Sequence, residues 1–376
     1  MRIGIPKEIK SGENRVSMTP EGVDALGRAG ASVIVQAGAG LESGFTDDEY
    51  SAAGGAIVPS AREAWDTDLV VKVKEPVTTE YPFLSEKTSL FTYLHLAALP
   101  ELTDALLARR VTAIAYETVT VEGRLPLLKP MSEVAGILSV QVGARALEKS
   151  CGGRGVLLSG AGGVPASRVL VIGAGIAGRS AARVAAGVGA AVTILDISAE
   201  KLVRAAGEIP AGVRTVLSTQ ESIRAEIAEA DLVISTVLVV GDKAPVLVSR
   251  EMLRMMKKGA AVVDISIDQG GSFETSRPTT HAAPYFVEEG VVHYCVANMP
   301  AAVPRTSTAA LVSATLPYVV SLARDGVEGA LCKDSALRAG LNTFRGKVTC
   351  EGVAKALRRV YTQPETLLTL KRGRSS

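Results

Sequence analysis

Three glycines, Gly173, Gly175 and Gly178, form a G-x-G-x-x-G motif, a spacing that can bind the pyrophosphate of a dinucleotide. The motif follows an apolar stretch at residues 169–172 that is rich in β-branched side chains, as in a buried strand of a parallel sheet. An alanine-rich stretch at residues 179–188 is expected to be a helix. The glycines would permit a tight turn, close approach of the backbone to the ligand, and close packing of helix on strand. The free N–H groups of the helix N-terminus would then hold the phosphates.

An acidic residue occupies the position at which a dinucleotide site needs one. A second apolar strand is expected at residues 191–195 and ends in Asp196, 18 residues after Gly178. A carboxylate at this spacing accepts hydrogen bonds from the adenosine ribose hydroxyls and repels a 2′-phosphate, which favours NAD over NADP. Glycines in a strand-to-helix turn often serve packing alone. Here the strand, the glycines, the helix, the second strand and the acid occur in order, so the sequence predicts dinucleotide binding.

Two further candidates for chemistry, Lys74 and His95, follow apolar strands expected at residues 68–73 and 90–94. In open α/β sheets, ligands bind beyond the carboxyl ends of the strands. Both side chains are therefore expected at one edge of a sheet. Each has a plainer explanation: Lys74 could be a charge that ends an apolar strand, as Lys72 could be, and His95 could be a capped structural residue.

The elements that must position these residues alternate between strand and helix. A strand at 2–6, a helix that starts at Thr19 and Pro20, and a strand at 33–35 give the order typical of a parallel sheet. Beyond Asp196 the sequence predicts helices at about 199–207 and 221–229, and strands at about 213–217, 231–238, 260–265 and 291–295.

Two long helices are expected to connect two domains. One runs from residue 129 to 149, and the other begins at about residue 304 and returns the chain to the first domain. The sequence therefore predicts an α/β protein in which residues 129–304 form a nucleotide-binding domain. This domain is inserted into a domain made of residues 1–128 and 305–376.

Composition excludes several classes of protein. The 376 residues suffice for two or three domains, and the 41 basic and 39 acidic side chains nearly cancel, unlike a nucleic-acid-binding surface. No stretch approaches the roughly 18 apolar residues of a membrane span, and the N-terminus lacks the apolar core of a signal peptide, so a cytoplasmic protein is expected. The four cysteines form no C-x-x-C pair and are expected to be buried free thiols rather than disulfides or a zinc site.

The chain resembles the L-alanine dehydrogenases, of the alanine dehydrogenase and pyridine nucleotide transhydrogenase family, along nearly its whole length. The segments that carry the resemblance are GIPKE at 4–8, Arg15 within ENRVSMTP, KVKEP at 72–76, YLHLA at 93–97, PMSEVAG at 130–136, VIGAGIAG at 171–178, DISIDQGG at 264–271 and CVANMP at 295–300. The resemblance implies two Rossmann-like, doubly wound domains linked by long helices, a cleft between them, and usually a homohexamer. It also implies NAD-dependent, reversible oxidative deamination of L-alanine to pyruvate and ammonium.

The resemblance assigns roles to individual residues. It implies that Arg15 and Lys74 bind the substrate carboxylate, for which Arg15 offers a planar fork, although a loop arginine is more often a solvated surface charge. His95 is then the general acid/base, a role that suits imidazole near neutral pH. Asp268 would lie beside the nicotinamide and activate the water that forms and breaks down the carbinolamine, whereas D-Q-G-G alone would indicate a turn-forming aspartate. Asp264, inside the preceding strand, is the weaker candidate.

The resemblance also implies a set of NAD-binding residues in addition to the three glycines and Asp196. They are Ser132 near the phosphates or nicotinamide; Ala174, Ile176 and Ala177 within the glycine motif; Lys201 near the ribose; Ser218, Val237 and Leu238 around the adenine and ribose; Ile265, Ser266, Ile267, Asp268 and Arg277; Val296 and Ala297; and Asn298 and Met299 beside the nicotinamide. Val237 and Leu238 could equally be core residues.

One departure from the family pattern concerns metal. Some members carry an acid and a histidine on the helix after a P-x-T-S-T segment, where this chain has Ser321 and Asp325, so no essential metal is expected.

The expected partners are small molecules and further copies of the chain in a hexamer, with no nucleic acid and no membrane. The alternatives are the NAD-binding subunit of a proton-translocating transhydrogenase, which shares the GIPKE opening, a non-catalytic NAD(H)-binding regulator, and a lysine- or saccharopine-forming relative.

Overall fold

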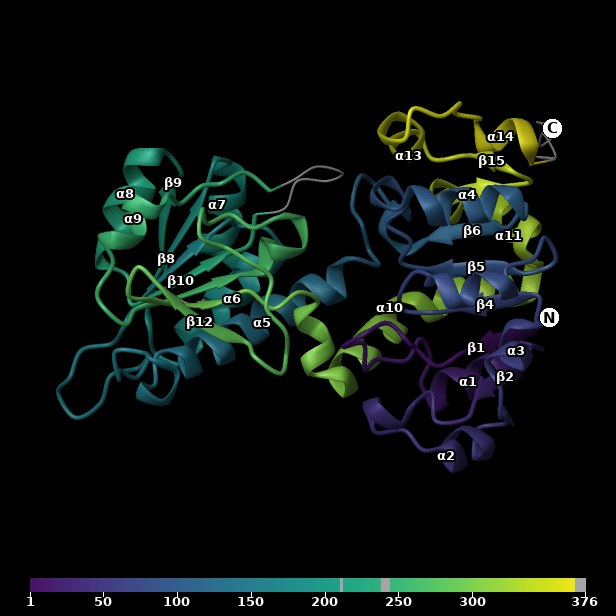
Figure 1. Cartoon of the computed structure of the whole chain (residues 1–376), viewed down its shortest axis with the longest axis horizontal. Coiled ribbons are helices and arrows are strands. Elements are labelled where there is room, and N and C mark those ends of the chain that lie inside the picture. Colours follow the sequence, from purple (N-terminus) through teal and green to yellow (C-terminus); the bar gives the residue numbers. More distant parts are fainter. Residues whose placement is uncertain (210–211, 238–243, 369–376) are drawn as a thin grey trace. The chain divides into compact units, whose positions relative to one another are not determined.

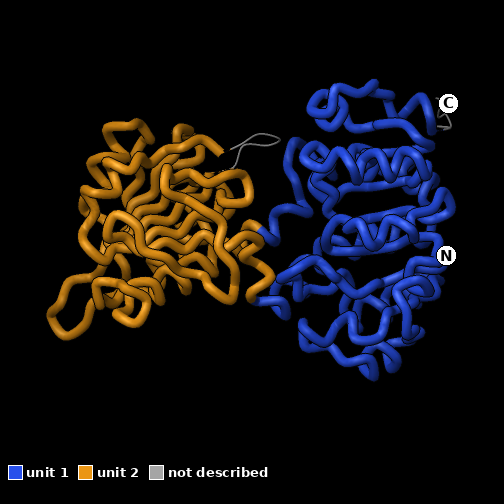
Figure 2. Tube along the Cα trace, viewed as in Figure 1, with its two compact units in different colours: residues 1–131, 303–376 blue, residues 132–302 orange. Residues whose placement is uncertain are grey.

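The computed structural model describes residues 1–209, 212–237 and 244–368. It divides into two compact units, which Figure 2 colours separately: unit 1 comprises Met1–Met131 and Val303–Ser376, and unit 2 comprises Ser132–Ala302. Each unit is built around a mostly parallel sheet flanked by helices (Figure 1). This arrangement confirms the expected α/β class with two doubly wound sheets.

The sheet of unit 1 has the strand order β15-β14-β6-β5-β4-β1-β2-β3. Its strands are β1 (Arg2–Ile5), β2 (Ser32–Gln36), β3 (Ala56–Val58), β4 (Leu69–Val71), β5 (Ser89–Thr92), β6 (Thr112–Ala115), β14 (Leu341–Phe344) and β15 (Lys347–Val348). β1 pairs in parallel with β2 on one side and with β4 on the other, so the order of the strands reverses between β1 and β4. Such a switch point is where open α/β sheets bind their ligands.

Helices and 3-10 turns separate and follow the strands of unit 1. Its helices are α1 (Pro20–Arg28), α2 (Asp47–Ala52), α3 (Ala61–Trp65), α4 (Pro100–Ala108), α10 (Pro304–Asp325), α11 (Val327–Lys333), α12 (Ser335–Ala339), α13 (Glu351–Ala356) and α14 (Pro364–Leu367), with 3-10 turns η1 (Leu41–Ser43), η2 (Thr78–Phe83), η3 (Leu96–Ala98) and η4 (Tyr116–Thr118). Thr19 caps α1 by accepting from the N–H of Gly22 at 3.2 Å, and Pro20 occupies the first helical position, as the sequence predicts.

The helix α10 is the one helix among the described residues that is long and apolar enough to cross a membrane by length and composition alone. Core helices of proteins outside membranes pass the same test, so it is weak evidence of a span. Within unit 1, α10 packs against α1 and α11, and Leu311, Val312 and Val319 on it are buried.

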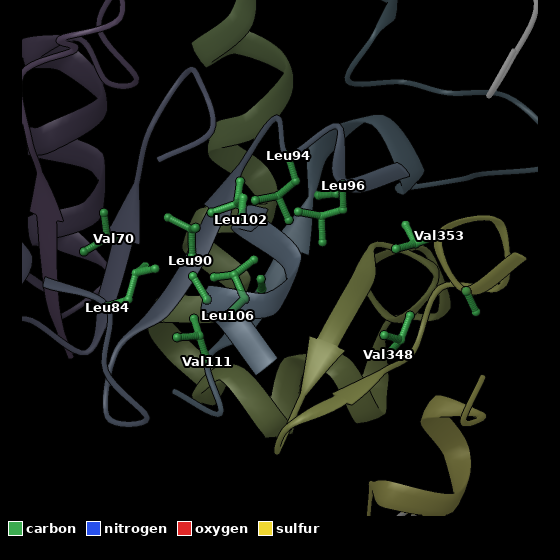
Figure 3. Packing of buried hydrophobic residues seen from close by; sticks show 14 of the residues in the cluster. Val70, Leu84, Leu90, Leu94, Leu96, Leu102, Leu106, Val111, Val348 and Val353 are labelled. Atoms are coloured by element: carbon green, nitrogen blue, oxygen red, sulfur yellow. The ribbon is translucent and has the colours of Figure 1, made fainter. Parts of the chain in front are cut away.

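One core of unit 1 joins residues from both ends of the chain. Leu90 of β5 and Leu102 and Leu106 of α4 form a buried cluster with Val348 of β15 and Val353 of α13 (Figure 3). The C-terminal segment therefore completes a core that the N-terminal strands begin.

The sheet of unit 2 has the strand order β12-β13-β11-β10-β7-β8-β9. Its strands are β7 (Arg168–Ile172), β8 (Ala191–Asp196), β9 (Arg214–Leu217), β10 (Leu232–Ser235), β11 (Ala261–Asp264), β12 (Tyr285–Glu288) and β13 (Val291–Tyr294). β12 pairs antiparallel with β13, whereas the other pairs are parallel. The switch point lies between β7 and β10.

Helices cover the sheet of unit 2 as the chain crosses from strand to strand. They are α6 (Ile176–Gly187), α7 (Ala199–Glu208), α8 (Gln220–Glu229) and α9 (Arg250–Arg254), with 3-10 turns η5 (Lys149–Cys151), η6 (Ile265–Gln269) and η7 (Met299–Ala302). The helix α5 (Lys129–Ala146) packs closely on the start of α6, because a Cβ at Gly136 would lie 2.1 Å from the carbonyl oxygen of Ala177.

Several elements differ from the sequence prediction at their ends. The strand expected at 260–265 ends at Asp264, and residues 265–269 form η6 instead of a plain loop. The strand expected at 68–73 covers only 69–71, and α6 begins three residues before its expected start, at Ile176. All four cysteines are free thiols, but only Cys295 is buried.

Candidate functional site

In unit 1, four polar side chains follow four neighbouring parallel strands. Arg15 lies in the loop after β1, Lys74 follows β4, His95 follows β5, and Glu117 follows β6. The parallel pairing of β1, β4, β5 and β6 places the carboxyl ends of these strands at one edge of the sheet. Arg15 and Lys74 come from the two strands that flank the switch point.

Arg15 is buried, with 3% of its surface exposed, so it is not the solvated surface charge that a loop arginine usually is. Its Nε and Nη2 donate to Oε1 and Oε2 of Glu13 at 2.7 and 2.5 Å, and Nη1 donates to the sulfur of Met131 at 2.9 Å. Burial works to lower the pKa of Arg15, but hydrogen bonding and the charge of Glu13 outweigh burial and raise that pKa above its ordinary value. Glu13 therefore fixes the guanidinium as a permanent cation.

Lys74 is a cation with no hydrogen-bonded or ion-paired anion among the described residues, although Glu75 and Glu13 are near enough to attract it. It is half-buried, and in the part of the chain that the structure describes it makes no hydrogen bond or ion pair. Burial, followed by repulsion from Arg15, lowers the pKa of Lys74. A bound anion would relieve this repulsion, so the edge is suited to a carboxylate.

Lys72, two residues before Lys74, is paired with two acidic side chains. It is fully buried, and its Nζ donates to Oε2 of Glu8 at 3.1 Å and to Oε1 of Glu80 at 2.9 Å. Although burial opposes the charge, both glutamates raise the pKa of Lys72. Lys72 is therefore a paired structural cation.

His95 has a left-handed backbone and a half-exposed ring. Its φ is 50°, 45% of its side chain is exposed, and its ring stacks on Tyr93 with centroids 6.0 Å apart. Glu117 accepts from the backbone N–H groups of Leu94 at 3.1 Å and His95 at 2.6 Å, which supports this backbone conformation. Nδ1 of His95 lies 3.9 Å from Oε1 of Glu117, beyond hydrogen-bond range.

Sequence reasoning did not identify Glu13 and Glu117. Glu117 could have been found by the argument that selected Lys74 and His95, because it follows the apolar stretch that forms β6. The sequence holds no comparable signal for the bidentate pairing of Glu13 with Arg15, which depends on how the loop after β1 folds.

In unit 2, the glycine motif occupies the turn between β7 and α6. Gly173 has a φ of 105°, which an L-amino acid with a side chain rarely adopts. A Cβ at Gly178 would lie 1.7 Å from the carbonyl oxygen of Gly173, so the close packing leaves no room for one. Within the described ranges, nothing lies within 4 Å of a Cβ placed on Gly175, and no side chain caps the N-terminus of α6. The loop therefore leaves space and N–H donors for a pyrophosphate.

Asp196 ends β8 and is hydrogen-bonded to the glycine loop. Its Oδ2 accepts from the N–H of Ala174 at 2.7 Å, and its Oδ1 accepts from the N–H of Ser198 at 2.8 Å. The carboxylate keeps further lone pairs for ribose hydroxyls. Ser218 donates its N–H to the carbonyl oxygen of Asp196 at 2.9 Å, which places Ser218 next to this strand end.

Asp268 and Asp264 have different surroundings. Asp264 is fully buried, and its carboxylate accepts from the N–H groups of Ser266 and Ser272 at 3.0 and 2.8 Å and from Oγ of Ser276 at 2.6 Å. Asp268 is exposed on η6 and accepts weakly from the N–H of Asn298 at 3.3 Å. Asp264 therefore organises the loop, and Asp268 is the accessible carboxylate.

The other expected NAD-binding residues lie mostly at the same edge of unit 2. Three groups follow strand ends: Val237 after β10; Ile265, Ser266 and Ile267 in η6; and Val296, Ala297, Asn298 and Met299 after β13. Ile176 and Ala177 begin α6. Lys201 is exposed in the first turn of α7. Ser266 donates to the carbonyl oxygen of Val237 at 2.6 Å, and Val237 also packs against a buried cluster. Leu238 lies outside the described residues.

Ser132 lies in α5, and Arg277 lies in the segment between η6 and β12. Ser132 is half-buried in the first turns of α5, one turn before Gly136, at which α5 packs on the first turn of α6. The guanidinium of Arg277 lies 3.9 Å from the centre of the ring of Phe286. Among the described residues, no group of three or more His, Cys, Asp or Glu side chains is placed to hold a metal ion.

The glycine loop, the uncapped helix and Asp196, on a doubly wound sheet, define a dinucleotide-binding protein. Comparison with known proteins gives the family. The family model for the N-terminal domain of alanine dehydrogenase/PNT matches residues 4–135, and the model for the C-terminal domain matches residues 139–351. The chain belongs to the alanine dehydrogenase/PNT family.

Individual relatives agree with this assignment. The chain is 51% identical to alanine dehydrogenase of Bacillus subtilis (strain 168) over 370 residues, which cover 98% of each chain. A solved structure of L-alanine dehydrogenase matches with a TM-score of 0.92 at 47% identity, covering 95% of this chain and 99% of the other. A transhydrogenase structure from Sinorhizobium meliloti matches with a TM-score of 0.81 at 26% identity, covering 93% and 99%.

Proposed function

We propose that the chain is an NAD-dependent L-alanine dehydrogenase, which converts L-alanine, NAD and water to pyruvate, ammonium and NADH, and catalyses the reverse reaction. The observation that carries this proposal is the cationic edge of unit 1. There Lys74 lies beside the buried Arg15 and makes no ion pair with any residue that the structure describes, in a chain about half identical to alanine dehydrogenases.

Arg15 and Lys74 bind the substrate carboxylate. Glu13 holds the Arg15 guanidinium in one orientation, so little side-chain entropy is lost on binding. Lys74 supplies the charge that the carboxylate neutralises, and a bound carboxylate favours the protonated form of Lys74.

Unit 2 holds the cofactor. The N–H groups at the start of α6 bind the pyrophosphate, and Asp196 accepts from the adenosine ribose and disfavours NADP. When bound, NAD supplies the oxidant that accepts a hydride from Cα of the amino acid.

Two residues move protons and direct water. His95, with its half-exposed ring, gives and takes protons as water adds to the oxidised substrate and ammonium departs. Asp268 is the accessible carboxylate that activates this water. The paired carboxylate of Asp264 keeps its structural role.

Formation of NADH from NAD and L-alanine tests the proposal directly. D-Alanine, glycine, serine and lysine are run in parallel, and NADP replaces NAD in a matched series. We expect rapid reduction of NAD that is selective for L-alanine and slow with NADP. Tight NADH binding with no turnover on any of these amino acids would contradict the proposal and favour a non-catalytic regulator.

Because the chain is also similar to a transhydrogenase structure, we consider a transhydrogenase subunit as the alternative function. A transhydrogenase subunit would pass hydride to a second nucleotide when combined with its membrane partners, not to a keto acid. We expect pyruvate and ammonium to oxidise NADH without any partner protein. Turnover that requires a second nucleotide would favour the rival.

We further propose that the chain forms a homohexamer, as the family resemblance implies, and that it is located in the cytoplasm, as its N-terminal sequence and apolar runs predict. Light scattering of the purified protein measures the assembly, and fractionation of the source cells measures the location. A monomer in solution, or enrichment in the membrane fraction, would contradict these assignments.

A further inference from the structure

A pocket of about 630 Å³ lies in unit 2 at the amino-terminal ends of its strands. Four cations line it: Lys149 and Arg154 after α5, and Lys257 and Lys258 before β11. The glycine motif follows the carboxyl end of β7, which runs parallel to β10 and β11, so the pocket and the motif lie at opposite edges of this sheet. Its volume is in the range of about 300–1,000 Å³ typical of small-molecule sites.

Backbone contacts fix the segments that carry these cations. The N–H of Arg154 donates to the carbonyl oxygen of Gly259 at 2.8 Å. The N–H of Gly259 donates in turn to the carbonyl oxygen of Gly290 at 2.8 Å. Gly259 has a φ of 75°, and a Cβ there would lie 2.7 Å from the backbone nitrogen of Arg154, so only glycine fits. The four cations therefore belong to a built pocket, not to independent surface loops.

The pocket has more positive charge than its own acids neutralise. Asp231 faces two of the cations, with Oδ1 at 3.0 Å from Nζ of Lys257 and 3.3 Å from Nη1 of Arg154. Lys149 and Lys258 make no ion pair within the described ranges. The one carboxylate that pairs with these cations contacts only two of the four, and the remaining positive charge favours an anion with more than one charge.

One buried donor in the pocket wall lacks an acceptor. Nε of Arg154 is inaccessible to solvent and has no hydrogen-bond partner among the described residues. Buried donors in native proteins are nearly always satisfied, so this Nε marks a guanidinium whose hydrogen bonds to the described residues are incomplete.

We propose that this pocket binds a small, multiply charged phosphate compound, with a diphosphate group as its recognised part, independently of the dinucleotide. Arg154 donates from its guanidinium to phosphate oxygens, and Lys149 and Lys258 neutralise the remaining charge from two sides. Asp231 keeps Arg154 and Lys257 in place, because it bonds to both.

The test uses inorganic pyrophosphate and the full-length protein saturated with NADH, so that the glycine motif is occupied. Binding is measured by calorimetry for the wild type, Arg154→Ala, and the double variant Lys149→Ala/Lys258→Ala. The matched control is Lys87→Ala/Lys347→Ala, which removes two exposed lysines of unit 1 and changes the net charge equally. NADH affinity is measured for every variant as a check on folding.

We expect one pyrophosphate to bind per chain in the wild type and the control. Both pocket variants should bind at least about tenfold more weakly with unchanged NADH affinity, because charge-assisted bonds to phosphate are lost. Absence of binding to the NADH-saturated wild type would overturn the proposal, as would an equal loss in the control. If Arg154→Ala disturbs Asp231 and fails to fold, the double variant decides, because neither of its lysines forms an ion pair with a described residue.

Discussion

At the residue scale, the cationic edge of unit 1 depends on which charges have partners. Lys72 and Lys74 share a strand end, yet Lys72 is neutralised by two glutamates and Lys74 is repelled by Arg15. The strand β4 stops at Val71, so both lysines lie beyond it, where the alternation of side chains along a strand no longer fixes their directions. Charge pairing thus separates the structural lysine from the candidate for substrate binding.

Substitution of Lys74 should affect anion binding and its pH dependence. Lys74→Met should weaken pyruvate binding by about 2 kcal/mol or more, roughly thirtyfold, because a desolvated charge pair is lost. The pKa of Lys74 is lowered, so the side chain loses its charge at a lower pH than an ordinary lysine does. The affinity for pyruvate should fall as the pH rises through this lowered pKa. Calorimetric titration of pyruvate into the NADH-bound protein measures both effects.

Lys74→Arg serves as the control for this pH dependence, because an arginine keeps its charge over the whole range. The alkaline loss of pyruvate affinity should therefore disappear in Lys74→Arg. An unchanged alkaline loss in this variant would show that another group titrates.

Replacement of His95 can separate its chemistry from its backbone conformation. Asparagine tolerates a φ of 50° better than most residues, so His95→Asn should keep the fold while removing the proton-transfer group. We expect kcat to fall by about 10²–10⁴-fold with the melting temperature nearly unchanged. His281→Asn is the control and should retain wild-type turnover; a similar kcat in both variants would remove His95 from the mechanism.

The candidate residues differ in how far the sequence could predict them. The resemblance selected Lys74 over Lys72 and Asp268 over Asp264; in the structure Lys72 is paired and buried and Asp264 is buried. Glu117 binds backbone N–H groups 22 and 23 residues away in sequence. Such contacts follow from strand pairing and have no local signal.

At the element scale, the turn from β7 to α6 is specified by steric fit. The strand, the glycines and the helix were predictable because each has a local signature in the sequence. The short strands β3, β6, β12, β14 and β15 were not predicted. Stretches such as LNTF at 341–344 have neither length nor alternation to distinguish them from loops.

Two glycines of α6 allow a matched test of this turn. Gly178→Ala places a Cβ 1.7 Å from the carbonyl oxygen of Gly173, so it should lower the free energy of unfolding by about 1–3 kcal/mol and weaken NADH binding. Gly187→Ala, in the last turn of the same helix, meets nothing within 4 Å and should stabilise by about 0.5–1 kcal/mol. Denaturant unfolding and NADH fluorescence measure the two effects; equal behaviour of the variants would contradict the steric argument.

At the scale of the whole molecule, both units follow one plan. In unit 1 the parallel strands run in the order β3-β2-β1-β4-β5-β6, and in unit 2 they run β9-β8-β7-β10-β11-β13. Each switch point thus lies beside the first strand of its unit. Only unit 2 has a glycine motif after that strand, whereas the loop in unit 1 carries Arg15.

The separate core of unit 2 predicts that it functions in isolation. We expect a fragment of residues 129–304 to fold and to bind NADH within about a factor of ten of the full chain, because the switch point and its glycine loop lie inside it. It should have no turnover with L-alanine, since Arg15, Lys74 and His95 are missing. Fluorescence titration and an activity assay check this; an unfolded fragment would show that unit 2 needs unit 1.

The discontinuity of unit 1 also determines the order in which a ribosome can finish the two units. Unit 2 is one continuous segment and is complete once residue 302 has emerged, whereas the sheet of unit 1 needs β14, which pairs with β6, from the last part of the chain. Until then, β6 is an unpaired edge that can join a strand from another nascent chain. The unit that begins first is therefore finished last, and its exposure to aggregation lasts for most of translation.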